Sequence, residues 1–144
     1  MRYLGIDLGS KTVGLAMSDT TLTIASTYKT IFFKDEDYNS TINEIKDIIK
    51  ENNITKIILG LPKNMNNTEG ERCEKTKEFA QMLERRTGLS VVLWDERLTT
   101  VAAEQTLIES GVRRENRKQY VDKIAAVFIL QGYLDSIYMQ KTAE

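Results

Sequence analysis

Four carboxylates stand at positions where the sequence could build a hydrolytic site. Asp7 interrupts an apolar run that opens at residue 3, Asp95 and Glu96 directly follow the apolar run 91–94, and Asp122 opens the last apolar stretch. A carboxylate within an apolar strand is costly unless it is paired or holds a cation. Asp7 therefore either caps the turn that follows it through local hydrogen bonds or belongs to a site.

The composition narrows the chemistry that these carboxylates can support. The chain of 144 residues has no histidine and a single cysteine, Cys73. This excludes an internal disulfide and both Ser-His-Asp and Cys-His nucleophilic catalysis, and it argues against a structural zinc site. Any hydrolysis must rest on carboxylates, lysine, tyrosine or a metal ion bound mainly by oxygen.

Carboxylates that converge on one point repel each other unless divalent cations lie between them. Oxygen ligands in such a cluster favour Mg²⁺ or Mn²⁺. Two such ions, about 3.5–4 Å apart, would activate water and stabilise the leaving oxygen in phosphodiester cleavage. Each residue also has a simpler explanation: Glu96 could pair with Arg97, and Asp122 could complement the dipole of its helix. Convergence in a protein without imidazole favours the metal-dependent nuclease.

A nuclease also needs cations that hold phosphates. Residues 112–119 contain four cationic side chains and one anionic side chain. They immediately precede Asp122. Arginine forks suit phosphate, and such contacts give salt-sensitive affinity. The alternative is a solvated connector. The net charge of -1 gives no general attraction to a polyanion, so a local patch would be required. The cations of this run are Arg113, Arg114, Arg117 and Lys118, and Lys11, Lys63 and Arg97 could add contacts at the same edge.

The elements that must position these residues follow from hydrophobic periodicity. Apolar runs predict strands, and repeats of three to four residues predict amphipathic helices. We expect strands at 3–8, 13–18, 24–33, 56–61 and 90–94, with a polar break at 35–39 and a loop at 63–70. We expect helices through Ile42–Lys50, where Asn52-Asn53 would end the helix because asparagine tolerates the left-handed conformation, and over 71–86. Further helices are expected from Thr99 or Thr100 to Glu109 and over 120–138, with a charged connector at 112–119.

This order predicts an α/β protein with a mixed five-stranded sheet flanked by helices. The first three strands form an antiparallel meander, and right-handed crossovers add the others in parallel. Ligands gather at the carboxyl ends of parallel strands, so Asp7 and the end of the last strand should meet there. Successive residues of a strand face opposite sides of the sheet, so only one of Asp95 and Glu96 should face the site. The length suits one domain over residues 1–144.

Four ordered motifs resemble those of the YqgF (RuvX-like) family of pre-ribosomal-RNA and Holliday junction nucleases. The resemblance spans essentially the whole chain and implies a ribonuclease H-like fold. It also implies that Asp7, Glu96 and Asp122 are the catalytic carboxylates and the ligands of Mg²⁺ or Mn²⁺. The motifs are Gly5-Ile6-Asp7-Leu8-Gly9, Gly60-Leu61-Pro62, Asp95-Glu96-Arg97-Leu98-Thr99-Thr100 and Val121-Asp122 with Ala125-Ala126.

The family resemblance leaves the substrate open between two nucleic acids. One is the precursor of small-subunit ribosomal RNA, cut at its 5′ end; the other is a Holliday junction in DNA. A non-catalytic RNA-binding adaptor in ribosome biogenesis is a further alternative. The opening motif also resembles that of actin-like ATPases and sugar kinases. Those proteins need two such domains in longer chains, and no second Asp-x-Gly hairpin occurs here.

The stretch Ile124–Leu130 is apolar on all sides. Such a helix is either buried within the chain or covers a sheet on one side and a second copy on the other, which would give a homodimer. We find no charged leader and no long apolar stretch at the N-terminus, so we expect no membrane span and a cytoplasmic location.

Overall fold

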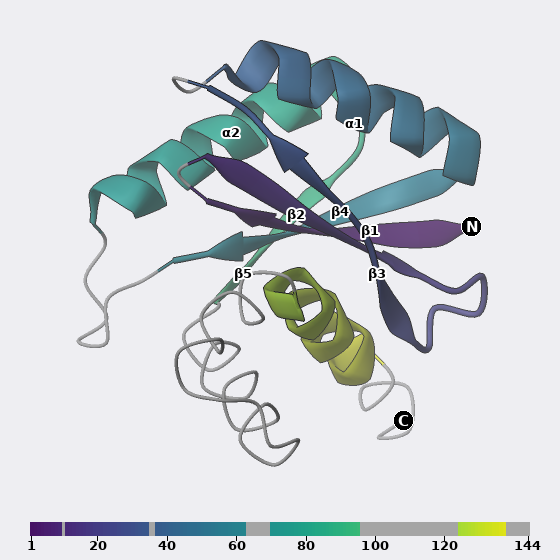
Figure 1. Ribbon diagram of the computed structural model, residues 1–144. Helices are drawn as coiled ribbons and strands as arrows, with labels where there is room; N and C mark the ends of the chain where they lie inside the picture. Colours follow the sequence, from purple (N-terminus) through teal and green to yellow (C-terminus); the bar gives the residue numbers. More distant parts are fainter. Residues whose placement is uncertain (10, 35–36, 63–69, 96–123, 138–144) are drawn as a thin grey trace, which may run out of the picture.

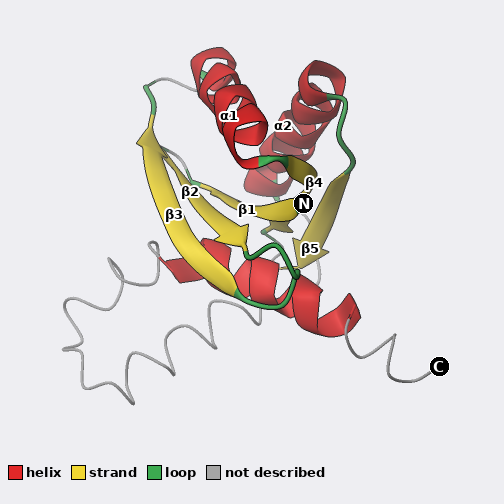
Figure 2. Ribbon diagram, turned by 90° about the vertical axis from the view of Figure 1, so that its right-hand side faces the viewer, coloured by secondary structure: helices red, strands yellow, loops and turns green. Residues whose placement is uncertain are grey.

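A computed structural model of the protein describes residues 1–9, 11–34, 37–62, 70–95 and 124–137. A twisted five-stranded sheet carries two helices on one face and a third helix, residues 124–137, on the other (Figure 1, Figure 2). The elements are β1 (Arg2–Leu8), β2 (Thr12–Ser18), β3 (Ala25–Phe32), α1 (Tyr38–Asn52), β4 (Ile54–Leu61), α2 (Glu71–Thr87) and β5 (Val91–Asp95).

The strands lie in the order β3-β2-β1-β4-β5. β1 pairs antiparallel with β2 and β2 with β3, whereas β4 pairs parallel with β1 and β5 with β4. This confirms the predicted mixed sheet with an antiparallel meander. The carboxyl ends of β1, β4 and β5, at Leu8, Leu61 and Asp95, therefore lie at one edge of the sheet, which we call the carboxyl edge.

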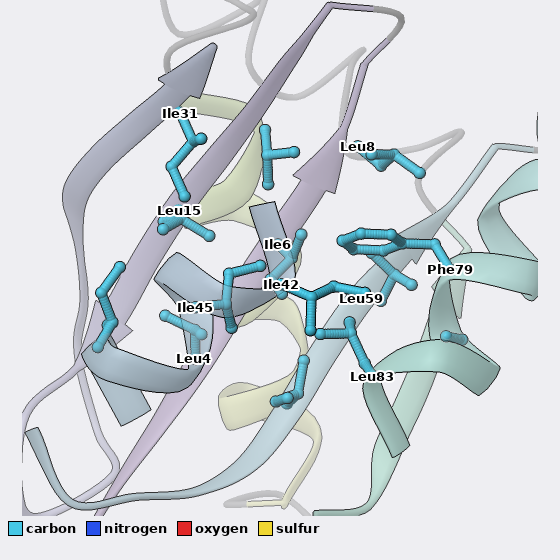
Figure 3. Close-up of a cluster of buried hydrophobic side chains, with 14 of the residues drawn as sticks. Leu4, Ile6, Leu8, Leu15, Ile31, Ile42, Ile45, Leu59, Phe79 and Leu83 are labelled. Carbon is cyan, nitrogen blue, oxygen red and sulfur yellow. The ribbon is translucent and has the colours of Figure 1, made fainter. Parts of the chain in front are cut away.

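The larger core fills the space between the sheet and the helices α1 and α2 (Figure 3). Strand alternation sends every second residue of β1 into it, and the isoleucine stripe of α1 and the inner face of α2 meet them. The ring of Phe79 lies among them without any exposure. The strand and α1 contributors include Leu4, Ile6, Leu59, Ile42 and Ile45. The intervening β1 residues Tyr3, Gly5 and Asp7 consequently belong to the opposite face.

Helix α1 begins earlier than the sequence pattern predicts. Residues Tyr38 and Asn39, expected in a polar break, are helical. The carboxylate of Asp37 caps the helix by accepting a hydrogen bond from the Ser40 amide at 3.3 Å. An aspartate N-cap makes a helix start look like a polar loop in the sequence, which explains the error. The predicted end is confirmed, because Asn53 adopts a left-handed conformation with φ of 55°.

The other described elements agree with the prediction to within a few residues. β4 begins at Ile54, two residues before the expected strand, and the predicted closing helix is helical over residues 124–137. The predicted helix ending at Glu109, the connector 112–119 and nearly all of the loop 63–70 lie outside the described residues. Within the described ranges, no helix has the length and apolar character needed to cross a membrane.

Candidate active site

Asp7 is the penultimate residue of β1 and lies at the carboxyl edge, half-buried. It pairs directly with Gly14 of β2, and the register of Ile6 with Leu59, continued by one residue, places Gly60 of β4 on its other side. Neither neighbouring strand therefore presents a side chain next to the Asp7 carboxylate. Glycine at such positions permits the close approach of a ligand or of another chain segment.

The helix of residues 124–137 lies on the same face as Asp7 and very close to β1. A Cβ atom built on Gly5 would lie 2.7 Å from the Cβ of Leu130 and 2.9 Å from the carbonyl oxygen of Ala126. Further back along β1, the ring of Tyr3 lies 6.2 Å from that of Tyr133, measured between centroids. Strand and helix thus run in opposite directions, and Asp7 lies toward the amino-terminal end of this helix.

Side-chain contacts at its other end fix this helix on the sheet. The side-chain oxygen of Gln131 accepts a hydrogen bond from the Ala25 amide at 2.8 Å, and its Nε2 donates to the Thr23 carbonyl at 2.9 Å. The indole of Trp94 meets the ring of Tyr133 edge-on at 5.9 Å. These contacts attach the helix to the start of β3 and to β5, so its separation from Asp7 is set by the whole sheet.

An ammonium group closes the same aromatic cluster. Lys56 Nζ donates a hydrogen bond to the hydroxyl of Tyr133 at 3.2 Å and lies 5.3 Å from the ring centroid of Tyr3. The hydrogen bond from Lys56 to Tyr133 raises the pKa of the lysine, against a smaller opposing effect of burial. This cluster contacts the amino-terminal half of β1 rather than Asp7, so we assign it to holding the helix.

The two carboxylates at the end of β5 are separated by strand alternation. Val91 packs against the core beneath α1 and α2, whereas Trp94 packs against the helix of residues 124–137. Asp95 comes four residues after Val91 in the same strand, so alternation places it on the same face as Val91. This is the α1 and α2 side of the sheet, opposite to the face of Asp7. Of the two residues left open by the sequence, this arrangement favours Glu96, which itself lies outside the described residues.

Two cations bracket the carboxyl end of β1. Lys11 lies, exposed, in the turn to β2, which the Gly9 amide closes by donating to the Thr12 carbonyl at 2.7 Å. Arg72 donates from Nη2 to the Leu8 carbonyl at 3.2 Å. Arg72 is not among the residues predicted from the sequence. The sequence does contain an indication that Arg72 has a role outside its helix, because a cation in the first turn of a helix interacts unfavourably with the helix dipole.

The remaining predicted site residues fall outside the described part of the chain. Among the residues that the structure does describe, no three metal-ligating side chains come together. Of the predicted site residues, the structure describes Asp7 and Lys11, and both lie at the carboxyl end of β1. The site predictions that lie outside are Glu96, Asp122, Lys63, Arg97, Arg113, Arg114, Arg117 and Lys118.

Comparison with known proteins agrees with this architecture. A family model described as "RuvX: Holliday junction resolvase" matches residues 1–136. An Agathobacter rectalis protein named "Putative pre-16S rRNA nuclease" is 60% identical over 136 residues, covering 94% of this chain and 95% of its own. A Bacillus subtilis protein of the same name is 50% identical over 137 residues, covering 95% and 99%.

A solved structure extends the likeness to the fold. RuvC of T. thermophilus, in complex with a Holliday junction substrate, superposes with a TM-score of 0.61 and covers 95% of this chain and 96% of its own. The two sequences are only 11% identical, so this likeness concerns the fold alone. The ribonuclease H-like α/β fold expected from the sequence is confirmed.

Proposed function

The chain belongs to the RuvX family, and from this premise we propose that it is a metal-dependent nuclease whose catalytic carboxylates are Asp7, Glu96 and Asp122. The observation that carries the proposal is the setting of Asp7. This carboxylate lies at the carboxyl edge, flanked by the glycines Gly14 and Gly60 and on the face that the helix of residues 124–137 covers. If Asp7 only capped the turn that follows β1, none of these features would be required.

The donor set suits a hard divalent cation. Asp7, Glu96 and Asp122 supply only carboxylate oxygens, the ligands that Mg²⁺ and Mn²⁺ take. When bound, such ions activate water and stabilise the leaving oxygen of a phosphodiester. Asp7 contributes its oxygens from a rigid strand, which holds them in a fixed place. The exposed ammonium of Lys11, in the turn that follows β1, would bind a phosphate next to the cut. The guanidinium of Arg72 donates to the Leu8 carbonyl and so holds the end of β1 from the α2 side.

The relatives named as pre-16S rRNA nucleases, at 50–60% identity over nearly the full chain, support the precursor of small-subunit ribosomal RNA as the substrate. The family description and the fold shared with RuvC support a four-way DNA junction as the second candidate. Cleavage of a 16S precursor RNA, single strands, duplexes and four-way junctions, each with Mg²⁺, Mn²⁺ or chelator, separates the two. We expect cleavage near the 5′ end of the mature RNA.

The substitution Asp7→Asn tests the catalytic assignment. It removes the charge that binds the cation while preserving the shape of the side chain, so cleavage should be abolished at every metal concentration while the fold remains intact. The matched control is Asp47→Asn, because Asp47 is exposed on α1, on the other side of the sheet. Cleavage by folded Asp7→Asn protein at the wild-type rate would refute the assignment.

The cationic run is tested separately by Arg113→Ala combined with Arg114→Ala. Loss of two phosphate contacts should weaken binding and reduce the slope of log affinity against log salt by about 0.7–0.9 per contact. Lys46→Ala with Lys50→Ala removes two cations from α1 and serves as the control. An unaltered salt slope in the arginine variant would identify residues 112–119 as a plain connector.

A further inference from the structure

Phe32 is the most exposed large hydrophobic side chain in the described part of the chain, at 77% of its full exposure. It is the last residue of β3, an edge strand of the sheet. Its sequence neighbours Ile31 and Phe33 are both buried in the core beneath α1. The chain thus turns one aromatic ring outward between two side chains that it buries. No packing within the described residues accounts for this exposure.

The strand registers place Phe32 on the same face as Asp7 and at the same edge. Asp7 pairs with Gly14, and Gly14 pairs with Thr30. Two pairs further on, Thr12 is opposite Phe32 and belongs to the turn that Gly9 closes. Phe32 is therefore two strands across and two residues along from Asp7. At ordinary strand spacings this separates their Cα atoms by about 12 Å.

Two lysines, Lys11 and Lys34, lie at this end of β3, and acidic residues follow at positions 35–37 of the sequence. The Phe33 amide donates to the Lys11 carbonyl at 3.0 Å, which fixes the end of the strand beside the β1–β2 turn. Lys11 and Lys34 are both exposed, and neither forms an ion pair with a described residue. An outward aromatic ring on a strand end that also carries exposed lysines combines the two features that bind single-stranded nucleic acid without regard to sequence.

The other exposed aromatic residue of β3 lies in a different electrostatic setting. Tyr28, 43% exposed, lines an open hollow at the opposite end of the strand together with Asp19. Hydrogen bonds from Thr21, Thr23 and Ile24 lower the pKa of Asp19 to about 2, so its carboxylate is negative at neutral pH and repels phosphate. The same hollow is also lined by Arg2, so the charges there are mixed. Tyr28 therefore provides a matched control for Phe32, with a comparable ring on the same strand but away from the end that carries Asp7 and Lys11.

The geometry points to Phe32 as a platform on which a base of the substrate strand stacks, next to the Asp7 site and with Lys11 on the adjoining phosphate. This inference rests on the proposed nuclease function and adds the path of the strand. At a rise of about 3.4 Å per stacked nucleotide, the stacked base lies about three or four nucleotides from the scissile phosphate. The occupant is an unpaired segment of nucleic acid, since the bases within a duplex stack on one another and leave no free face.

Binding measurements separate stacking from charge. With Asp7→Asn protein and a fluorescent single-stranded RNA, adding Phe32→Ala should raise Kd about tenfold and leave the salt slope unchanged. Phe32→Trp should restore affinity. Lys11→Ala should instead reduce the slope by about 0.7, the value for one single-strand phosphate contact. Tyr28→Ala should change neither. An unaltered Kd in the Phe32→Ala protein would overturn the inference.

An abasic scan of the substrate locates the stacked base. Removal of the base at one position, three or four nucleotides from the cut, should raise KM for the wild-type protein and leave that of Phe32→Ala unchanged, because the partner is already lost. Equal effects on both proteins would overturn the inference. So would a Phe32→Ala protein that binds RNA normally but changes its oligomeric state, which would identify the ring as a protein contact. The Kd and salt-slope measurements need no cleavage, so cleavage by Asp7→Asn protein would refute the proposed catalytic assignment without deciding them.

Discussion

Gly5→Ala should damage both stability and catalysis, because Gly5 sets the distance between the sheet and the helix of residues 124–137. The added Cβ would lie 2.7 Å from the Leu130 Cβ and 2.9 Å from the Ala126 carbonyl oxygen. Ordinary carbon contacts are about 3.5–4.0 Å, so the helix must withdraw by about 1 Å. Shortening Leu130 to alanine would not remove the clash, since the Cβ at position 130 and the Ala126 carbonyl oxygen remain.

The magnitude follows from how the core can respond. Overpacking of a close-packed interior costs about 1–3 kcal/mol. For a chain of this length each kcal/mol lowers Tm by about 2–4 °C, so we expect a fall of about 2–12 °C. Asp7 is two residues further along the same face of β1. A displacement of about 1 Å between catalytic groups reduces the rate by about 10²-fold, so kcat should fall by a similar factor.

Gly88→Ala is the matched control for this experiment. Gly88 ends α2 with φ of 74°, and a Cβ there would meet nothing within 4 Å. Alanine in that left-handed conformation costs about 1–2 kcal/mol, a loss of stability similar to that of Gly5→Ala. Gly88→Ala should therefore lower Tm while leaving kcat at the wild-type value, measured well below both melting temperatures.

Two results would refute the reasoning about Gly5. A Gly5→Ala protein with wild-type Tm would show that the helix does not rest on β1 at this point. A protein with lowered Tm but normal kcat would show that the separation of helix and sheet does not position the catalytic carboxylates. Equal losses of kcat in Gly5→Ala and Gly88→Ala would assign the effect to general destabilisation.

Three further predictions concern acid stability, the choice of carboxylate and assembly. Hydrogen bonds lower the pKa of Asp19 from 3.8 to about 2, so its contribution to stability is present above pH 3.8 and is lost as the pH falls from there toward 2. Urea unfolding across this range should show a shallower acid decline for Asp19→Asn. Asp95→Asn should retain metal-dependent cleavage while Glu96→Gln loses it, and the reverse result would contradict the alternation argument. A homodimer built on the outer side of the helix of residues 124–137 would sediment at micromolar concentration above the 16.5 kDa of the chain, and a single 16.5 kDa species would exclude it.

The sequence by itself determined the elements and their order. Helix and strand patterns depend on residues a few positions apart, so Asn53 as the end of α1 and the isoleucine stripe that begins at Ile42 could be identified directly. The start of α1 could not, because Asp37 has the same composition signal as a loop. The sequence also identified Asp7 as a carboxylate out of place in an apolar strand, and the four motifs led from it to the family.

Only the tertiary structure decided what surrounds Asp7, because strand register depends on residues far apart in the chain and a slip of one residue reverses every face. The register placed Gly14 and Gly60 beside Asp7 and turned Asp95 away from it. In β3 the pairing with β2 shifts between Leu15 and Ala16, so alternation along the sequence could not assign the face of Phe32. The approach of Arg72 to the end of β1 likewise joins residues 64 positions apart, which no local pattern can predict.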